Sequence, residues 1–212
     1  MFIPAMFRLD DRAAAVELIR QNSFGLLVTA PEGRATATHL PFLFDPERGE
    51  QGTLIAHMAR ANPQWRDFAA LEAADGEALA VFQGAHAYVS PTWYGGEGPR
   101  VPTWNYMAVH AYGRPQIVEE PASVRVILAR LVETHEAGLT PPWSMESQEA
   151  KFLESMMRGI VAFEMPVTRL EAKAKLSQNR TTEQRAGVLA ALEADADPVT
   201  QEVARQMRVL VE

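Results

Sequence analysis

The stretch AHMARANPQW (residues 56–65) decides much of the fold, because a predicted strand ends and a predicted helix begins inside it. Residues 53–58 predict a short strand, and Asn62-Pro63 predicts a helix start. Asparagine is a common N-cap, and proline suits the first helical position because its missing N–H has no helical partner there. Exposed N–H groups at such a start can hold a phosphate. Ordinary capping by Asn62 explains the same residues equally well.

Upstream of this stretch, the sequence predicts one helix followed by two strands. Residues 11–21 have helical spacing of apolar side chains, and Asp10 suits the N-cap. The apolar runs 24–30 and 38–44 predict buried strands, and Pro and Gly at residues 31–33 predict the turn between them.

Downstream of this stretch, the sequence predicts strands first and mainly helices towards the C-terminus. Strands are predicted at residues 78–83, at 104–118 as a strand pair or one bent strand, and at 160–165. Helices are predicted from Pro121, at residues 148–157, from Thr181 with a capping box to Gln184, and after Pro198. This order is not the alternation of a doubly wound sheet. It favours a mainly β or α+β class, an antiparallel barrel with peripheral helices and a C-terminal helical segment.

Composition narrows the function. The chain has 212 residues, no cysteine, a net charge of −7 and a pI near 5.3. Nucleic-acid binding rests on neutralising phosphates with Lys and Arg, so the charge does not favour DNA as a partner. The most basic window, residues 165–185, holds five cations against two anions. We expect a cytoplasmic protein without a membrane span, because no apolar run is long enough for one and the N-terminus lacks signal-peptide features.

Four segments place polar residues within pieces that look buried. They are 38–41, 56–65, the pair 82–94 and 101–106, and 173–180. Aromatic rings beside amides suit a flat heterocycle, and Lys, Ser, Gln, Asn and Arg in one short loop suit an anion. Each segment alone has an ordinary structural explanation. No metal motif, nucleophile elbow or P-loop is present, and no catalytic residue can be assigned.

Taken together, the segments are more specific. HLPF (39–42), HMARANPQW (57–65), FQG (82–84), YVSP (88–91), VPTWNY (101–106) and KLSQNR (175–180) occur in this order. They resemble the signature blocks of the PaiB family, and the resemblance covers the chain up to about Leu192. It implies an FMN-binding split β-barrel, related to the pyridoxamine-phosphate oxidase group, that forms a homodimer with each flavin in a groove between subunits. The barrel domain would span residues 1–180, and 181–212 would form a helical appendage.

The resemblance also implies which residues contact FMN. For the phosphate and ribityl end they are Thr38, His39, His57, Arg60, Asn62, Gln64 and Gln83. For the ring, or as the partner subunit's contribution, they are Trp104, Asn105, Lys175, Ser177, Gln178 and Arg180.

One departure from the family pattern concerns the block before residue 175. The family is expected to have a glycine and a tryptophan where this chain has Ala172 and Ala174, and the loss of a tryptophan near the groove opens the pocket or weakens flavin retention.

Three functions remain open at this stage. The first is an FMN-binding dimer with a regulatory role in transcription or metabolism. The second is a flavin-dependent reductase or oxidase of a small molecule. The third is a flavin-free regulator that binds DNA or a protein.

Overall fold

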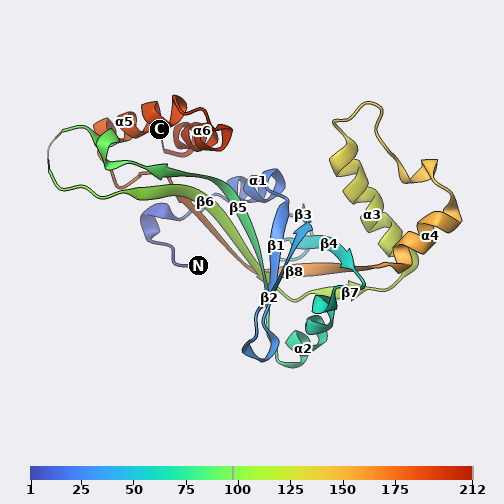
Figure 1. Cartoon of the computed structure of the whole chain (residues 1–212). Coiled ribbons are helices and arrows are strands. Elements are labelled where there is room, and N and C mark those ends of the chain that lie inside the picture. The colour runs from blue at the N-terminus through green and yellow to red at the C-terminus, as the bar shows by residue number, and fades with distance from the viewer. Residues whose placement is uncertain (97, 212) are drawn as a thin grey trace. The chain divides into compact units, whose positions relative to one another are not determined.

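The computed structural model describes residues 1–96 and 98–211, which cluster into two compact units. Unit 1 comprises residues 1–22, 83–110 and 171–212, and unit 2 comprises residues 23–82 and 111–170. The strands (Figure 1) are β1 Phe24–Thr29, β2 Thr36–Pro41, β3 Leu43–Asp45, β4 Thr53–Ala59, β5 Ala78–Val89, β6 Thr103–Gly113, β7 Gln116–Val118 and β8 Ile160–Lys175. The α-helices are α1 Arg12–Gln21, α2 Asp67–Ala73, α3 Pro121–Glu136, α4 Ala150–Arg158, α5 Thr182–Glu193 and α6 Pro198–Val211. Short 3₁₀ turns are η1 Ala5–Phe7, η2 Pro31–Gly33, η3 Pro63–Arg66, η4 Pro91–Tyr94 and η5 Met145–Ser147.

The described strands pair in the order β2-β1-β5-β6-β8-β4-β3, with β7 also paired to β8. The pairs β1–β2, β1–β5, β3–β4, β4–β8 and β7–β8 are all antiparallel. Helices flank the sheet and close the chain. The predicted class, an antiparallel sheet with peripheral and C-terminal helices, is therefore confirmed. The predicted boundary between a barrel domain and an appendage at residue 180 stays a prediction.

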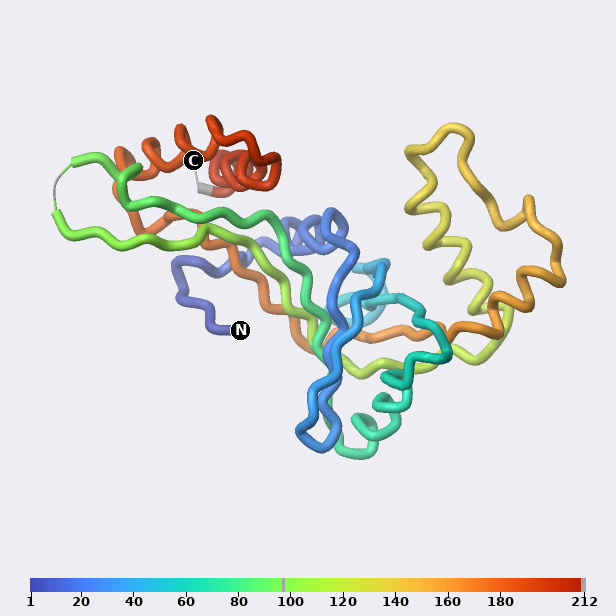
Figure 2. Tube along the Cα trace, in the orientation of Figure 1, coloured from blue at the N-terminus to red at the C-terminus, as the bar shows by residue number. Residues whose placement is uncertain are grey.

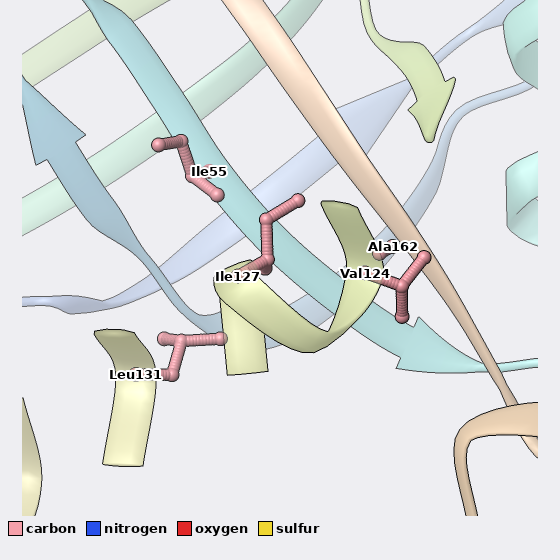
Figure 3. Packing of buried hydrophobic residues seen from close by; sticks show 5 residues of the cluster. All are labelled: Ile55, Val124, Ile127, Leu131 and Ala162. Atoms are coloured by element: carbon pink, nitrogen blue, oxygen red, sulfur yellow. The ribbon is translucent and has the colours of Figure 1, made fainter. Parts of the chain in front are cut away.

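Unit 2 has an aromatic and aliphatic core on the sheet. Phe42 lies edge-on to both Phe82 and Phe163, with ring centroids 5.4 and 6.4 Å apart. On β4 and β8, Ile55 and Ala162 pack against Val124, Ile127 and Leu131 of α3 (Figure 3). The helical spacing of these three α3 residues is what makes one face of the helix apolar.

Unit 1 places helices against the sheet. Gly84 on β5 allows α1 to approach, because a Cβ there would lie 2.8 Å from Leu18 Cδ1 and 3.3 Å from Met107 Cβ. Helices α5 and α6 contact each other, and α5 also packs on η4. Figure 2 shows β5 and β6 of this unit as neighbouring antiparallel traces. No described helix is long and apolar enough to cross a membrane.

The structure corrects some predicted boundaries. The N-cap of α1 is Asp11, whose Oδ1 accepts from Ala13 N at 2.8 Å, and not Asp10. β5 continues to Val89 and β8 continues to Lys175, so the predicted loop 173–180 begins as strand. The predicted Thr181–Gln184 capping box is present.

Candidate functional site

In unit 2, Asn62 and Gln64 tie the start of η3 to the β1–β2 hairpin. Asn62 Oδ1 accepts from Gln64 N at 3.0 Å, and its Nδ2 donates to Thr38 Oγ1 at 2.9 Å. Gln64 is 1% exposed. Its Nε2 donates at 3.1 Å to Leu27 O, Thr29 Oγ1 and Thr36 O. The Asn62 amide and Gln64 Nε2 are therefore used in local contacts, whereas Gln64 Oε1 is buried without a hydrogen-bond partner among the described residues. Contact of either residue with FMN stays a prediction.

Arg60 follows β4 and is held in a fixed orientation. Its Nε donates to Arg158 O at 2.9 Å, and its Nη2 donates to Ile160 O at 2.7 Å. Two of the five N–H donors of the guanidinium are used in this way, which leaves three. Trp65 Nε1 donates to Arg60 O at 3.0 Å, so the indole is fixed beside it.

Arg60 and Trp65 line a pocket with a volume of about 630 Å³. The rest of the wall combines apolar residues of β7, α3, α4 and β8 with charged side chains. The charged residues besides Arg60 are Glu119, Glu154 and Arg158. The pocket is within the usual size range of small-molecule and cofactor sites.

The two predicted histidines of unit 2 have different surroundings. His39 is exposed, and its ring stacks on Phe24 with centroids 5.8 Å apart. His57 lines a separate apolar pocket under α3 and α4, and burial lowers its pKa. The structure therefore does not bring His57 into the pocket lined by Arg60.

In unit 1, Lys175 is fixed next to β6. Its Nζ donates to Thr103 Oγ1 and, at 2.9 Å, to Trp104 O. Burial lowers the pKa of Lys175, and the charges of Lys173 and Arg180 lower it further. A cluster of three cations in one place favours an anion nearby.

Asn105 and Ser177 form a buried polar pair in the same unit. They are 0% and 3% exposed, and Asn105 Nδ2 donates to Ser177 Oγ at 3.0 Å. Nδ2 also lies 3.6 Å from Met207 Sδ of α6. Ser177 has φ of +66°, a left-handed conformation that is rare for residues with a Cβ. These contacts give both residues a structural role, whatever their relation to FMN.

The loop after β8 is closed by Gln178. Its Oε1 accepts from Leu176 N at 2.7 Å, and its Nε2 donates to Ala174 O at 2.6 Å. The Arg180 guanidinium carbon lies 4.3 Å from the centroid of the Tyr94 ring. Ala174 is 3% exposed, and its effect on flavin retention stays a prediction.

An exposed face of β5 and β6 gathers the remaining predicted residues of unit 1. The alternation of buried and exposed residues on β5 shifts by one between Gly84 and Ala87, as at a β-bulge. Gln83 and His86 are consequently close, with Gln83 Nε2 3.3 Å from His86 Nδ1. Trp104 then lies 6.4 Å from the His86 ring and 6.0 Å from the Tyr88 ring, centroid to centroid. Trp104 is 52% exposed and Tyr88 46%.

Several lining residues were not among the predicted ones. Trp65 and Arg158 line the pocket of Arg60, and His86 and Tyr88 share the exposed face with Trp104. Trp65 is the last residue of the predicted segment 56–65 and could have been included from its position. Arg158 could not, because its contact with Arg60 depends on how β4 pairs with β8.

Comparison with known proteins accounts for this arrangement. A family model described as "Putative FMN-binding domain" matches residues 1–169. The Bacillus subtilis protein "Protease synthase and sporulation protein PAI 2" is 36% identical over 207 residues, which cover 98% of this chain and 96% of that protein. The chain belongs to this PaiB-type family. An uncharacterised protein of Emericella nidulans is also 30% identical over 228 residues, covering 91% of this chain and 90% of that protein.

Solved structures share the fold of the family at low sequence identity. A FAD and haem binding protein from Mycobacterium smegmatis aligns with a TM-score of 0.57 at 14% identity, covering 79% of this chain and 73% of that chain. A structure described as a 5-nitroimidazole antibiotic resistance protein from Bacteroides thetaiotaomicron aligns with a TM-score of 0.55 at 14% identity, covering 78% and 85%.

The donor set of this chain fits a flavin mononucleotide. The phosphate of FMN needs fixed cations, which Arg60 offers in unit 2 and Lys175 and Arg180 offer in unit 1. The ring needs apolar and aromatic walls, which both the pocket of Arg60 and the exposed β5–β6 face offer.

Proposed function

We propose that this chain binds FMN, works as a homodimer and has a regulatory role. The proposed binding of FMN rests on one observation, the oriented guanidinium of Arg60 in the wall of the 630 Å³ pocket. This residue lies in HMARANPQW (57–65), the longest of the blocks that carry the family resemblance. In this proposal, bound FMN supplies redox chemistry, while the chain binds and orients it.

The argument for a phosphate at Arg60 rests on orientation and charge. Two backbone carbonyls hold the guanidinium, so little side-chain entropy is lost when it binds an anion. No carboxylate of the described residues forms an ion pair with it within 4.0 Å. A charge-assisted hydrogen bond from a fixed arginine to a phosphate is among the stronger polar contacts.

Titration with FMN and with riboflavin tests this step, because the two differ in the phosphate. We expect Arg60→Ala to weaken FMN binding about 10- to 100-fold, the loss of about 1.5–3 kcal/mol for a hydrogen bond to a charged group. Riboflavin binding should change by less than about 2-fold, because it offers no charge to the missing arginine. Fluorescence quenching of each flavin gives both dissociation constants.

The matched control is Arg34→Ala, which removes an exposed arginine of unit 2 that does not line the pocket. It should leave both affinities unchanged. An equal loss of FMN and riboflavin binding in Arg60→Ala would show that Arg60 acts by holding the backbone, and the phosphate assignment would be wrong. If the unaltered chain bound no FMN at all, the proposed function itself would fail.

The dimer is supported by the exposed face of unit 1. Trp104 and Tyr88 are half exposed, and large aromatic side chains in one patch are typical of interface cores. We expect light scattering of the full chain to give twice the mass of 23.4 kDa. Trp104→Ser should shift the equilibrium towards monomer, and a monomeric unaltered chain would contradict the proposal.

The regulatory role rests on the family resemblance, and the charge of −7 favours a protein or small-molecule partner over DNA. Binding to duplex DNA that weakens steeply with salt would contradict that preference. Titration of duplex DNA into FMN-loaded and FMN-free protein would show whether the flavin controls DNA binding.

A further inference from the structure

A second pocket lies in unit 2 and shares Met157 and Ile160 with the pocket of Arg60. It has a volume of about 240 Å³ and ten lining residues, nine of which are apolar. Leu128 and Val132 of α3, four residues of α4, and Trp143 and Met145 of the connection form most of the wall. Small-molecule sites are concave and lined mainly by apolar side chains with a few polar groups, and this pocket has that composition.

The exception in the wall is His57. It follows Ile55 by two residues on β4, so both lie on the sheet face that α3 covers. Its Nδ1 is buried without a hydrogen-bond partner among the described residues. Buried polar atoms are nearly always paired, so an unpaired one needs a reason. Burial lowers the pKa of His57, which makes the imidazole neutral at pH 7.

The rim of the pocket is apolar as well. Trp143, Phe152 and Met156 are 43%, 50% and 53% exposed, although they line the same cavity. Met145 and Met157 lie deeper in it. Methionine adapts to the shape of a ligand and makes favourable contacts with aromatic rings. The wall therefore combines ring-binding side chains with one neutral imidazole.

We propose that this pocket binds a small aromatic alcohol of one or two fused rings, whose hydroxyl group hydrogen-bonds to the imidazole of His57. The rings would occupy the space between the methionines and the two rim aromatics, Trp143 and Phe152. The two pockets share Met157 and Ile160, but His57 lines only this one and Arg60 lines only the other.

Size and chemistry set this ligand class. A cavity of roughly 150 Å³ lined by apolar side chains accommodates benzene, so 240 Å³ leaves room for about one further ring. A neutral imidazole has one donor and one acceptor nitrogen, and a hydroxyl group can donate or accept. Nδ1 is closed to solvent, so the hydroxyl pairs with Nε2, as donor or as acceptor according to the tautomer, whereas a carboxylate would place an uncompensated charge in an apolar wall.

The test compares 2-naphthol with naphthalene, which has the same rings without the hydroxyl. Both are titrated into the full chain carrying ¹³C-labelled methionine methyl groups, and NMR follows Met145, Met156 and Met157. We expect these three signals to shift, and 2-naphthol to bind about 3- to 10-fold more tightly than naphthalene, the worth of one net hydrogen bond. In His57→Phe this preference should fall to about one.

Two variants keep the test decisive. His135→Phe replaces an exposed histidine of α3 and should preserve the preference for 2-naphthol. Leu128→Phe enlarges a side chain in the wall and should weaken both probes while FMN binding stays unchanged. Should His57→Phe fail to fold, His57→Leu removes the hydrogen-bonding imidazole with a smaller apolar side chain and should abolish the preference in the same way. Equal binding of the two probes, or shifts confined to other methionines, would overturn the proposal.

Discussion

The Asn105–Ser177 pair offers a sharp test of whether these residues serve the fold or the cofactor. The sequence places both in segments that the family resemblance assigns to FMN. In the structure they are 0% and 3% exposed and hydrogen-bond to each other at 3.0 Å. Asn105→Ala leaves the Ser177 hydroxyl buried without this partner, and Ser177→Ala does the same to the Asn105 amide.

Each single substitution should lower the free energy of unfolding by about 1–3 kcal/mol, the cost of an unsatisfied buried polar group. The double variant should lose less than the sum, with a coupling energy of about 1–2 kcal/mol, because the two residues share one interaction. Ser177→Gly adds an internal comparison. It also removes the hydroxyl, but it relieves the left-handed backbone at φ +66°, so it should be about 1 kcal/mol more stable than Ser177→Ala.

Urea unfolding followed by tryptophan fluorescence gives the four free energies of the cycle, and FMN titration of the same samples gives the affinities. We expect the loss of stability to exceed any loss of FMN binding under conditions where every variant is folded. Additive stabilities, together with a large drop in FMN affinity, would refute the reasoning and return both residues to the flavin site.

Two further predictions concern packing and pH. Gly187→Ala should destabilise the chain by about 1–3 kcal/mol in thermal or urea unfolding, because a Cβ would lie 2.1 Å from Trp93 O. The same change in an open helix stabilises by about 1 kcal/mol. A more stable variant would therefore contradict the close approach of Gly187 to Trp93. Burial lowers the pKa of His57 and of His110 below 6.5 in the folded chain. As the pH falls, the unfolded chain therefore takes up protons before the folded chain does. The free energy of unfolding should fall below about pH 6.5, by at most about 1.4 kcal/mol per pH unit for each histidine. Urea unfolding between pH 7 and 5 should show a shallower dependence in His57→Phe, and an unchanged slope would contradict the burial of that imidazole.

Local signals predicted much of the fold because they act over a few residues. The capping box of Thr181 and Gln184 and the proline start of α3 were both found where the sequence placed them. The length of β8 was missed because its end is charged and looks like a loop. Lys173 is nevertheless 6% exposed, with its Nζ 4.9 Å from the Tyr106 ring and bonded to Phe2 O at 3.2 Å. Only the neighbouring strand and the N-terminal segment make that position suitable for a lysine.

The candidate site was predictable as a set of segments but not as a set of free functional groups. A sequence motif shows that Asn62, Gln64 and Gln178 have hydrogen-bonding side chains, but it does not show what they bond. Gln64 Nε2 bonds residues 28 to 37 positions away in the sequence, which the sequence alone does not reveal, whereas Gln178 bonds backbone groups two and four residues away. The same residue types occur whether their side chains rigidify a loop or bind a ligand.

Within each unit, the polar side chains fall into two groups. The amides of Asn62 and Gln64 fix the backbone on which Arg60 and Trp65 stand, and Gln178 fixes the loop that holds Arg180. The exposed or partly engaged groups are the cation of Arg60, the ring of Trp104 and the amide of Gln83. Substituting a holding residue should therefore change stability first and flavin affinity second, whereas substituting an available group should change affinity alone. Measuring the free energy of unfolding and the FMN affinity on the same variants separates the two groups of residues. A substitution that lowers FMN affinity without lowering stability identifies a residue that touches the flavin.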